Sequence, residues 1–340
     1  MNRTLTRKRF LLHLAGYAAL FALALFWCPL FGAEKISWAK AVSGFLSSSR
    51  GPDAEILVFH RLPRVLLALL VGGVLSSSGA ALQVTLKNPL AEPFLLGIAG
   101  AGAVGAVAAL CIPGLLFFAG PFSSVEIFAL VTAGACVAGI YLLASRGPGV
   151  NMGTILLAGV TLNILCGSAI LLIRYLVSPH LLVSMDRWMM GGLDVVGYRE
   201  LLTSLFLAAV GLAFVFRNTH ALYLVSFDER MAQSHGVNIA ATARSVLAGT
   251  GIATAAAVSV AGPIGFVGLI VPHAVRRFSG PDARMVLPAS FLGGGAFLAV
   301  CDLVARTVVA PTEMPVGIIT ALIGGPVFLR ILLTAGKRGG

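Results

Sequence analysis

The sequence predicts an all-α, polytopic membrane protein, and three observations lead to that prediction. Apolar residues make up 58% and charged residues 11% of the 340 positions, whereas a soluble domain carries roughly 25% charged residues. About ten apolar stretches follow one another, and most could cross a hydrocarbon core of roughly 30 Å as a helix of about 20 residues. The segments between them alternate between many and few basic residues. Irregular backbone cannot face lipid without unpaired polar groups, so helices are expected.

The first expected span, 10–31, follows a basic N-terminal tail. Its apolar run is longer than the roughly 7–15 residues of a signal-peptide core and has no small-x-small cleavage site, so we interpret it as a membrane helix. The other nine spans, in order, are expected at 60–83, 93–111, 124–145, 153–176, 199–216, 243–262, 264–276, 286–307 and 315–334. The eighth of the ten, 264–276, is too short to cross the membrane upright.

Prolines and glycines subdivide and pack these spans. Breaks are expected at Asn88-Pro89, Glu92-Pro93, Gly262-Pro263 and Val271-Pro272, because proline removes a ladder hydrogen bond and clashes with the preceding turn. Broken helices inside a membrane line cavities, which indicates transport. Many of the 40 glycines lie inside the spans and permit close helix contact.

A weak internal similarity suggests a repeat. Residues 61–79 and 244–262 each place an arginine before a small-residue-rich apolar run that ends in glycine. They would begin on opposite sides of the membrane, so the sequence predicts inverted repeats at about 60–176 and 243–334. Both would belong to one transmembrane domain spanning 1–340.

The basic residues predict the orientation of the chain. With both termini in the cytoplasm, alternation places fifteen of the 24 lysines and arginines inside, as the positive-inside rule expects. Arg61, Arg64 and Arg306 then lie outside together with Asp194 and Glu313, and Lys87 lies inside. Because the basic residues are scattered singly between apolar spans, they indicate membrane lipid and not nucleic acid as the partner.

Sequence motifs predict no catalysis by this chain. It has neither the G-x-x-x-x-G-K-[ST] phosphate loop nor H-E-x-x-H, and its five cysteines form no C-x-x-C pair. We therefore expect no metal site, no cofactor and no ATPase activity. Ionisable residues within the spans are few, chiefly Asp302 and Arg174, whereas an ion-coupled carrier needs a relay of such groups. That carrier, acting alone, remains the alternative; a membrane enzyme would need clustered His, Asp or Glu.

The longest inner connector, about 217–244, predicts a short helix. Ser226 would cap it, Asp228 and Glu229 would lie in its first turn, and Gly236 would end it. Such a helix could rest on lipid headgroups or could dock a cytoplasmic partner, and the residues alone favour neither.

Five motifs, in order over nearly the whole chain, together resemble those of the FecCD-type permeases and are similar to those of the cobalamin importer permease. These permeases are the membrane subunits of binding-protein-dependent ABC importers for iron siderophores, haem and cobalamin. The motifs are 61–64 (RLPR); the run 79–83 (GAALQ) with 87–93 (KNPLAEP) and 96–98 (LGI); 188–192 (WMMGG); 262–273 (GPIGFVGLIVPH); and 313–326 (EMPVGIITALIGGP).

The resemblance implies the type II ABC importer permease fold, with ten helices, working by alternating access in the bacterial inner membrane. It implies a homodimer, two cytoplasmic ATP-binding subunits, a periplasmic or lipid-anchored binding protein, and a metal chelate as substrate. Segment 188–192 looks like the cobalamin importers' version of that motif, but related iron permeases vary freely at these positions, so the motif does not decide the substrate. We rank ferric siderophore first as the substrate, then cobalamin, then haem.

The resemblance also assigns residues. Docking of the binding protein falls to Arg61, Arg64 and Arg306, since outward arginines pair well with carboxylates; snorkelling is the alternative for the first two. The inner turn at 149–153 departs from the family's small Ser/Thr gate. The residues assigned to coupling with the ATPase are Asp228, Glu229, Arg230, Ala232, Gln233, His235 and Gly236. Those assigned to the translocation pathway or its gate are Gln83, Asn88, Asn151, Met152 and Trp188.

Overall fold

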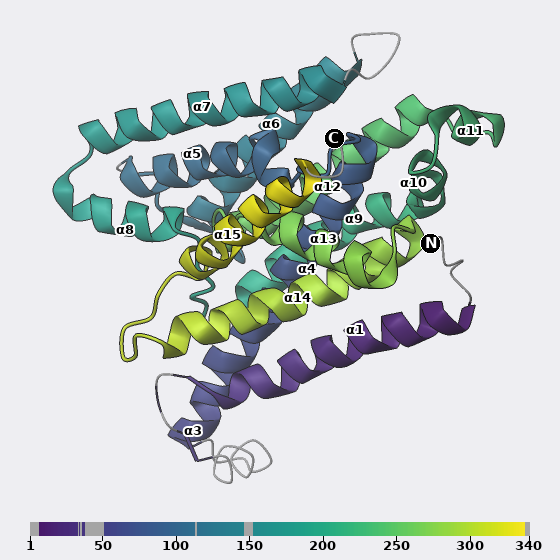
Figure 1. The fold of residues 1–340 in the computed structure, drawn as a ribbon. Helices are drawn as coiled ribbons and strands as arrows, with labels where there is room; N and C mark the ends of the chain where they lie inside the picture. Colours follow the sequence, from purple (N-terminus) through teal and green to yellow (C-terminus); the bar gives the residue numbers. More distant parts are fainter. Residues whose placement is uncertain are drawn as a thin grey trace.

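The structure, a computed structural model, describes residues 7–32, 34, 36–37, 51–112, 114–145 and 152–336. Within these ranges the fold is a bundle of helices (Figure 1). The long helices are α1 (Arg7–Trp27), α4 (Leu62–Thr85), α6 (Ser124–Ser145), α7 (Met152–Leu176), α9 (Arg199–Arg217), α12 (Ile239–Ala261), α14 (Ala283–Thr307) and α15 (Val316–Gly336).

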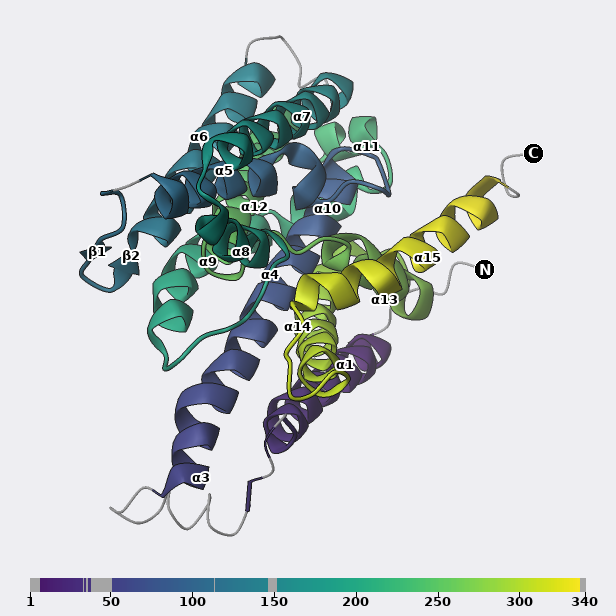
Figure 2. The same ribbon diagram turned by 90° about the vertical axis from the view of Figure 1, so that its left-hand side faces the viewer.

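Shorter elements connect the long helices. They are η1 (Cys28–Leu30), α3 (Pro52–Glu55), the π-helix η2 (Ile56–Arg61), η3 (Pro93–Leu96), α5 (Ile98–Cys111), α8 (Pro179–Met189), α10 (Thr219–Val225), α11 (Glu229–Ser234) and α13 (Val267–Ser279). The strands β1 (Phe118–Ala119) and β2 (Phe122–Ser123) form an antiparallel hairpin between α5 and α6, which is visible at the edge of the bundle in Figure 2.

Each of the ten predicted spans contains a helix, so the all-helical prediction is confirmed. Seven helices in the described part of the chain are long and apolar enough to cross a membrane. Helix α5 and the apolar part of α15 are shorter, and α13, with 13 residues, is too short to cross upright, as expected. Helices α8 and α10 were not predicted.

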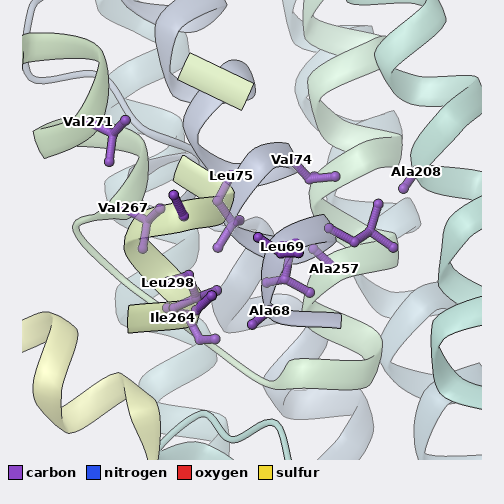
Figure 3. Close-up of a cluster of buried hydrophobic side chains, with 14 of the residues drawn as sticks. Ala68, Leu69, Val74, Leu75, Ala208, Ala257, Ile264, Val267, Val271 and Leu298 are labelled. Carbon is purple, nitrogen blue, oxygen red and sulfur yellow. The ribbon is translucent and has the colours of Figure 1, made fainter. Parts of the chain in front are cut away.

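Helix α4 forms the centre of the bundle. Its most apolar stretch is 94% buried, against 6% for α1 and 17% for α7, which lie at opposite edges of the molecule (Figure 1). In Figure 3, Leu69 and Leu75 of α4 lie among Ala257, Val267 and Leu298 from α12, α13 and α14. The exposed apolar faces of α1 and α7 are left for lipid or another chain.

Glycines bring α4 into backbone contact with its neighbours. A Cβ on Gly79 would overlap the carbonyl oxygen of Gly268 in α13, and one on Gly72 would overlap that of Gly294 in α14. Small residues are therefore required where these helices cross, which is the way helices pack closely in lipid.

Three of the four predicted proline breaks are confirmed. Pro89 and Pro93 lie in the loop after α4 and at the start of η3, and Pro263 follows α12. The break at Val271-Pro272 is wrong, because Pro272 lies inside α13. Pro272 cannot donate to the carbonyl of Gly268, four residues earlier, and the Gln83 Nε2 amide donates to that oxygen instead, at 3.1 Å.

The bundle has two ends, which we name by their residues. The arginine end holds Arg61, Arg64 and Arg306, and the connector end holds Lys87 and α11; Arg64 and Lys87 are roughly 35 Å apart along α4 at 1.5 Å per residue. Residues predicted to lie outside meet at the first end, since Arg64 pairs with Glu313. Those predicted inside meet at the second, since Lys87 pairs with Glu229.

The chain direction fits these two ends. The start of α1 and the end of α15 lie away from α3, which marks the arginine end (Figures 1 and 2). Helix α4 runs from the arginine end to the connector end and α12 runs back, as the predicted inverted repeats at 60–176 and 243–334 require. The repeat itself stays a prediction.

Candidate functional site

Three acidic side chains surround Arg64 at the arginine end. Its Nε donates to Asp302 Oδ1 at 2.9 Å, and its Nη1 lies 2.5 Å from Glu313 Oε2 and 3.1 Å from Asp194 Oδ1. Asp302 is fully buried, whereas the side chains of Asp194 and Glu313 are 42% and 34% exposed. Arg64 therefore joins a buried carboxylate to two that water reaches.

Asp302 also holds a second arginine. Arg306 follows it by one helical turn, and its Nε lies 2.9 Å from Asp302 Oδ2, within ion-pair distance but without the alignment of a hydrogen bond. Arg306 further donates to the carbonyl oxygens of Phe31 and Cys28, at 3.3 and 3.4 Å.

Arg61 donates hydrogen bonds to the segment that follows α1, as Arg306 does. It donates to the carbonyl oxygens of Pro29 and Leu30, each at 3.2 Å, and to that of Glu34. The last carbonyls of a helix have no partner within the helix, and cations there are favourable. Arg61 and Arg306 thus cap the α1–η1 segment from two other helices.

The three predicted docking arginines are buried, with exposures of 5% for Arg61, 8% for Arg64 and 3% for Arg306. They line a cavity of about 660 Å³ together with Asp194 and Glu313. The sequence analysis placed both acids outside but gave them no role in the site. The structure therefore makes the arginines part of an internal ion network; whether that network docks a partner stays a prediction.

Glycines bring three of the sequence motifs together. The Gly192 amide donates to Ala261 O at 2.9 Å, and the Gly317 amide donates to Gly191 O at 3.2 Å. A Cβ on Gly191 would lie 2.5 Å from Pro263 O, and Gly191 has φ +71°. The segments 188–192, 262–273 and 313–326 therefore meet through their backbones, a contact that only glycine allows.

Of the predicted pathway residues, Trp188 lies in a different part of the bundle from Gln83 and Asn88. Trp188 is half-buried and packs between α5 and α7 with Val107 and Ile170. Gln83 is 5% exposed; besides its bond to Gly268 its Oε1 accepts from Arg276.

The other pathway predictions fall near the connector end or outside the described residues. Asn88 stabilises the turn after α4, where its Oδ1 accepts from the Leu90 amide at 2.9 Å. Asn151 lies outside the described residues, and of Met152 only the backbone, at the start of α7, is described. The pathway assignment of these residues stays a prediction.

The predicted connector helix is present as α11. Its N-cap is Asp228, whose Oδ1 accepts from the Met231 amide at 2.9 Å. The predicted cap, Ser226, is wrong: its hydroxyl donates to Tyr223 O at 2.7 Å and so closes α10. Gly236, with φ +81°, follows the end of the helix as expected.

The residues of α11 differ in exposure. Ala232 is fully buried with Leu224 and Val225, and so it fixes the helix to α10. Phe227 and Met231 are 62% and 38% exposed, although they are apolar; the sequence analysis did not single them out. The other exposed residues of the predicted set are the polar Asp228, Arg230, Gln233 and His235, and Gly236.

Within the described ranges, no three His, Cys, Asp or Glu side chains gather in a way that could hold a metal ion.

Comparison with known proteins decides the family, since the model of the FecCD transport family matches residues 20–334. The chain belongs to the FecCD transport family. It is 40% identical to the cobalamin import system permease protein BtuC of Halobacterium salinarum, over 80% of this chain and 72% of that one. It is 39% identical to the hemin transport system permease protein HmuU of Yersinia pestis, over 80% and 81%.

A solved structure shares the fold of this FecCD permease. It is described as an inward-facing conformation of a putative metal-chelate type ABC transporter; the TM-score is 0.81 at 26% identity, covering 94% of this chain and 98% of that one. The predicted type II importer permease fold is confirmed.

Family membership also settles the broad function. The chain is the multi-pass permease subunit of an ABC importer and is not itself an ATPase. Such a permease works with an ATPase and a binding protein on other chains. The alternative of an ion-coupled carrier acting alone is thereby set aside.

Proposed function

We propose that this permease moves a metal-bound tetrapyrrole, cobalamin or haem, into the cytoplasm by alternating access. The observation that carries the proposal is the 39–40% identity to permeases named for cobalamin and hemin. This ranking places the ferric siderophores, which the motifs alone put first, behind both.

Uptake by the reconstituted complex tests the substrate. The permease, its ATPase and its binding protein are placed in proteoliposomes and offered cyanocobalamin, hemin or a ferric siderophore with ATP. ATP-dependent accumulation of either tetrapyrrole supports the proposal, and accumulation of the siderophore alone refutes it.

The arginine end is proposed to face the binding protein, and the connector end and both termini to face the cytoplasm, as the distribution of basic residues supports. Val196 at the arginine end is 65% exposed, and Gln233 of α11 is exposed. In intact cells an impermeant thiol reagent should label Val196→Cys and spare Gln233→Cys. The reverse pattern would invert the orientation.

The docking proposal for Arg61, Arg64 and Arg306 takes a specific form. A carboxylate of the binding protein entering the cavity would compete with Asp194 and Glu313 for Arg64, because both acids are partly exposed and both contact Nη1. Arg64 would keep its bond to Asp302 throughout.

Neutralising the competing acids tests this form of docking. The double variant Asp194→Asn and Glu313→Gln should bind the binding protein more tightly, with a steeper loss of affinity in salt. Charge reversal of all three arginines should weaken binding. Unchanged affinity in both variants, at unchanged folding, would remove the docking role.

Helix α11 is proposed to contact the ATPase. Its exposed Phe227 and Met231 offer apolar contact amid polar residues, which suits a protein partner. Met231→Asp should reduce co-purification of the ATPase, while Val196→Asp at the other end should not. Full co-purification with Met231→Asp would favour the alternative of a helix that rests on lipid headgroups.

The assembly is proposed to hold two permease copies and two ATP-binding subunits. The largely exposed apolar faces of α7 and α1 support a further partner or lipid there. Native mass measurement of the purified complex tests this stoichiometry; a single permease copy per complex would refute it.

A further inference from the structure

We propose that residues 87–96, here named the relay loop, transmit movement of α11 to α7 and α13. Lys87 is the positioning residue through which α11 holds the loop. The proposal deepens the one above, since it rests on α11 being the contact of the ATPase.

The relay loop is fastened to the connector at its first residue. Lys87 Nζ lies 2.8 Å from Glu229 Oε1, in the first turn of α11. Just before it, Val84 packs into the small apolar cluster that Leu224 and Ala232 form in the connector. An ion pair and an apolar contact therefore join the last turn of α4 to α10 and α11.

The other end of the relay loop is fastened to α7 and to the first turn of α13. The Asn163 Nδ2 amide of α7 donates to Phe94 O at 2.9 Å, and a Cβ on Gly159 would lie 2.6 Å from Leu95 O. Glu92 is 7% exposed, and a Cβ on Gly268 of α13 would lie 3.5 Å from Glu92 Cβ and 3.1 Å from Pro93 Cδ.

The loop between these attachments is braced. The Asn88 amide donates to Gln83 O at 3.2 Å, and the Ala91 and Leu95 amides donate to Asn88 O and Glu92 O at 3.0 and 3.1 Å. Pro89 and Pro93 restrict the backbone further. Lys87 has φ +48°, which few non-glycine residues adopt and which persists only where the surroundings hold it. A displacement at Lys87 is therefore transmitted to Phe94 and not absorbed in between.

The Lys87–Glu229 pair suits a positioning role better than a stabilising one. Its side chains are 56% and 41% exposed, and pairs so exposed contribute little to folding stability. Breaking it should leave a folded, assembled permease whose α11 no longer moves the relay loop.

A charge swap tests the relay. We expect Lys87→Glu and Glu229→Lys each to lower substrate uptake per ATP hydrolysed at least threefold in the reconstituted complex. The double variant, which restores an opposite-charge pair, should recover to within twofold of wild type. Arg277→Glu, an exposed arginine at the same end with no ion pair among the described residues, should change uptake per ATP less than twofold.

Two outcomes would overturn the relay. One is wild-type uptake per ATP in both single variants. The other is loss that the swap does not restore while the ATPase still co-purifies and thermal unfolding is unchanged. If α11 does not contact the ATPase, Met231→Asp will leave co-purification of the ATPase intact. That result does not depend on the Lys87–Glu229 charge swap, so the two failures can be told apart.

Discussion

The ion network at the arginine end makes a measurable prediction about stability. Asp302 is fully buried and lies 2.9 Å from both Arg64 and Arg306. Asp302→Asn keeps the size of the side chain but removes its charge. Arg306, 3% exposed, would then have no carboxylate partner among the described residues and would keep its bonds to the carbonyl oxygens of Cys28 and Phe31.

The magnitude follows from burial. Removing one partner of a buried ion pair costs about 3–5 kcal/mol, because the remaining charge is left uncompensated. Arg64 keeps Asp194 and Glu313, which reduces its share of the loss. We therefore expect Asp302→Asn to lower the free energy of unfolding by about 3 kcal/mol, near the lower limit of that range.

The matched control is Asp186→Asn. Asp186 pairs with Arg174, but the two side chains are 32% and 45% exposed, so the loss should stay below about 1 kcal/mol. Thermal unfolding in one detergent compares both variants with wild type. If both midpoints fall equally, the network does not stabilise the fold as argued.

Three further predictions concern packing, the connector and pH. Gly79→Val should prevent α4 from contacting Gly268 and abolish folded yield, whereas Gly134→Ala, with nothing within 4 Å of the added Cβ, should leave the yield unchanged. Gly236→Ala should cost about 1 kcal/mol through its φ of +81° alone, which a thermal midpoint equal to wild type would contradict. Burial raises the pKa of Glu92 from 4.5 to about 7, so wild-type stability should fall as pH rises from about 4.5 through 7; Glu92→Gln should remove that part of the slope, and an identical pH profile would refute it.

The helices could be predicted because lipid leaves the backbone no alternative. Predicted span 124–145 coincides with α6. Helix α12 begins four residues before its predicted span because Asn238, a polar residue, caps it through the Ala241 amide. Helix α8 has 11 residues and carries Asp186 and Arg187, so no hydropathy pattern marked it.

The burial of the arginines could not be predicted in the same way. Arg64 is 249 residues from Glu313 and 238 from Asp302, and no local pattern pairs positions so far apart. Charge placement grouped the three arginines at one end of the bundle but did not indicate whether a guanidinium faces water or an internal carboxylate. The role of Asp228 as a cap was missed because Ser226 offered the same chemistry two residues earlier.

The attachment of α1 has a consequence for biogenesis. Phe21 of α1 stacks on Phe291 of α14, with ring centroids 6.4 Å apart, and the Cys28 carbonyl, just after α1, accepts from Arg306, 278 positions later. The ribosome releases α1 first, yet its principal neighbour is translated near the finish. During synthesis α1 therefore lies in the bilayer without its main packing partner, so in a nascent chain arrested before α14 it should be open to cleavage by membrane proteases.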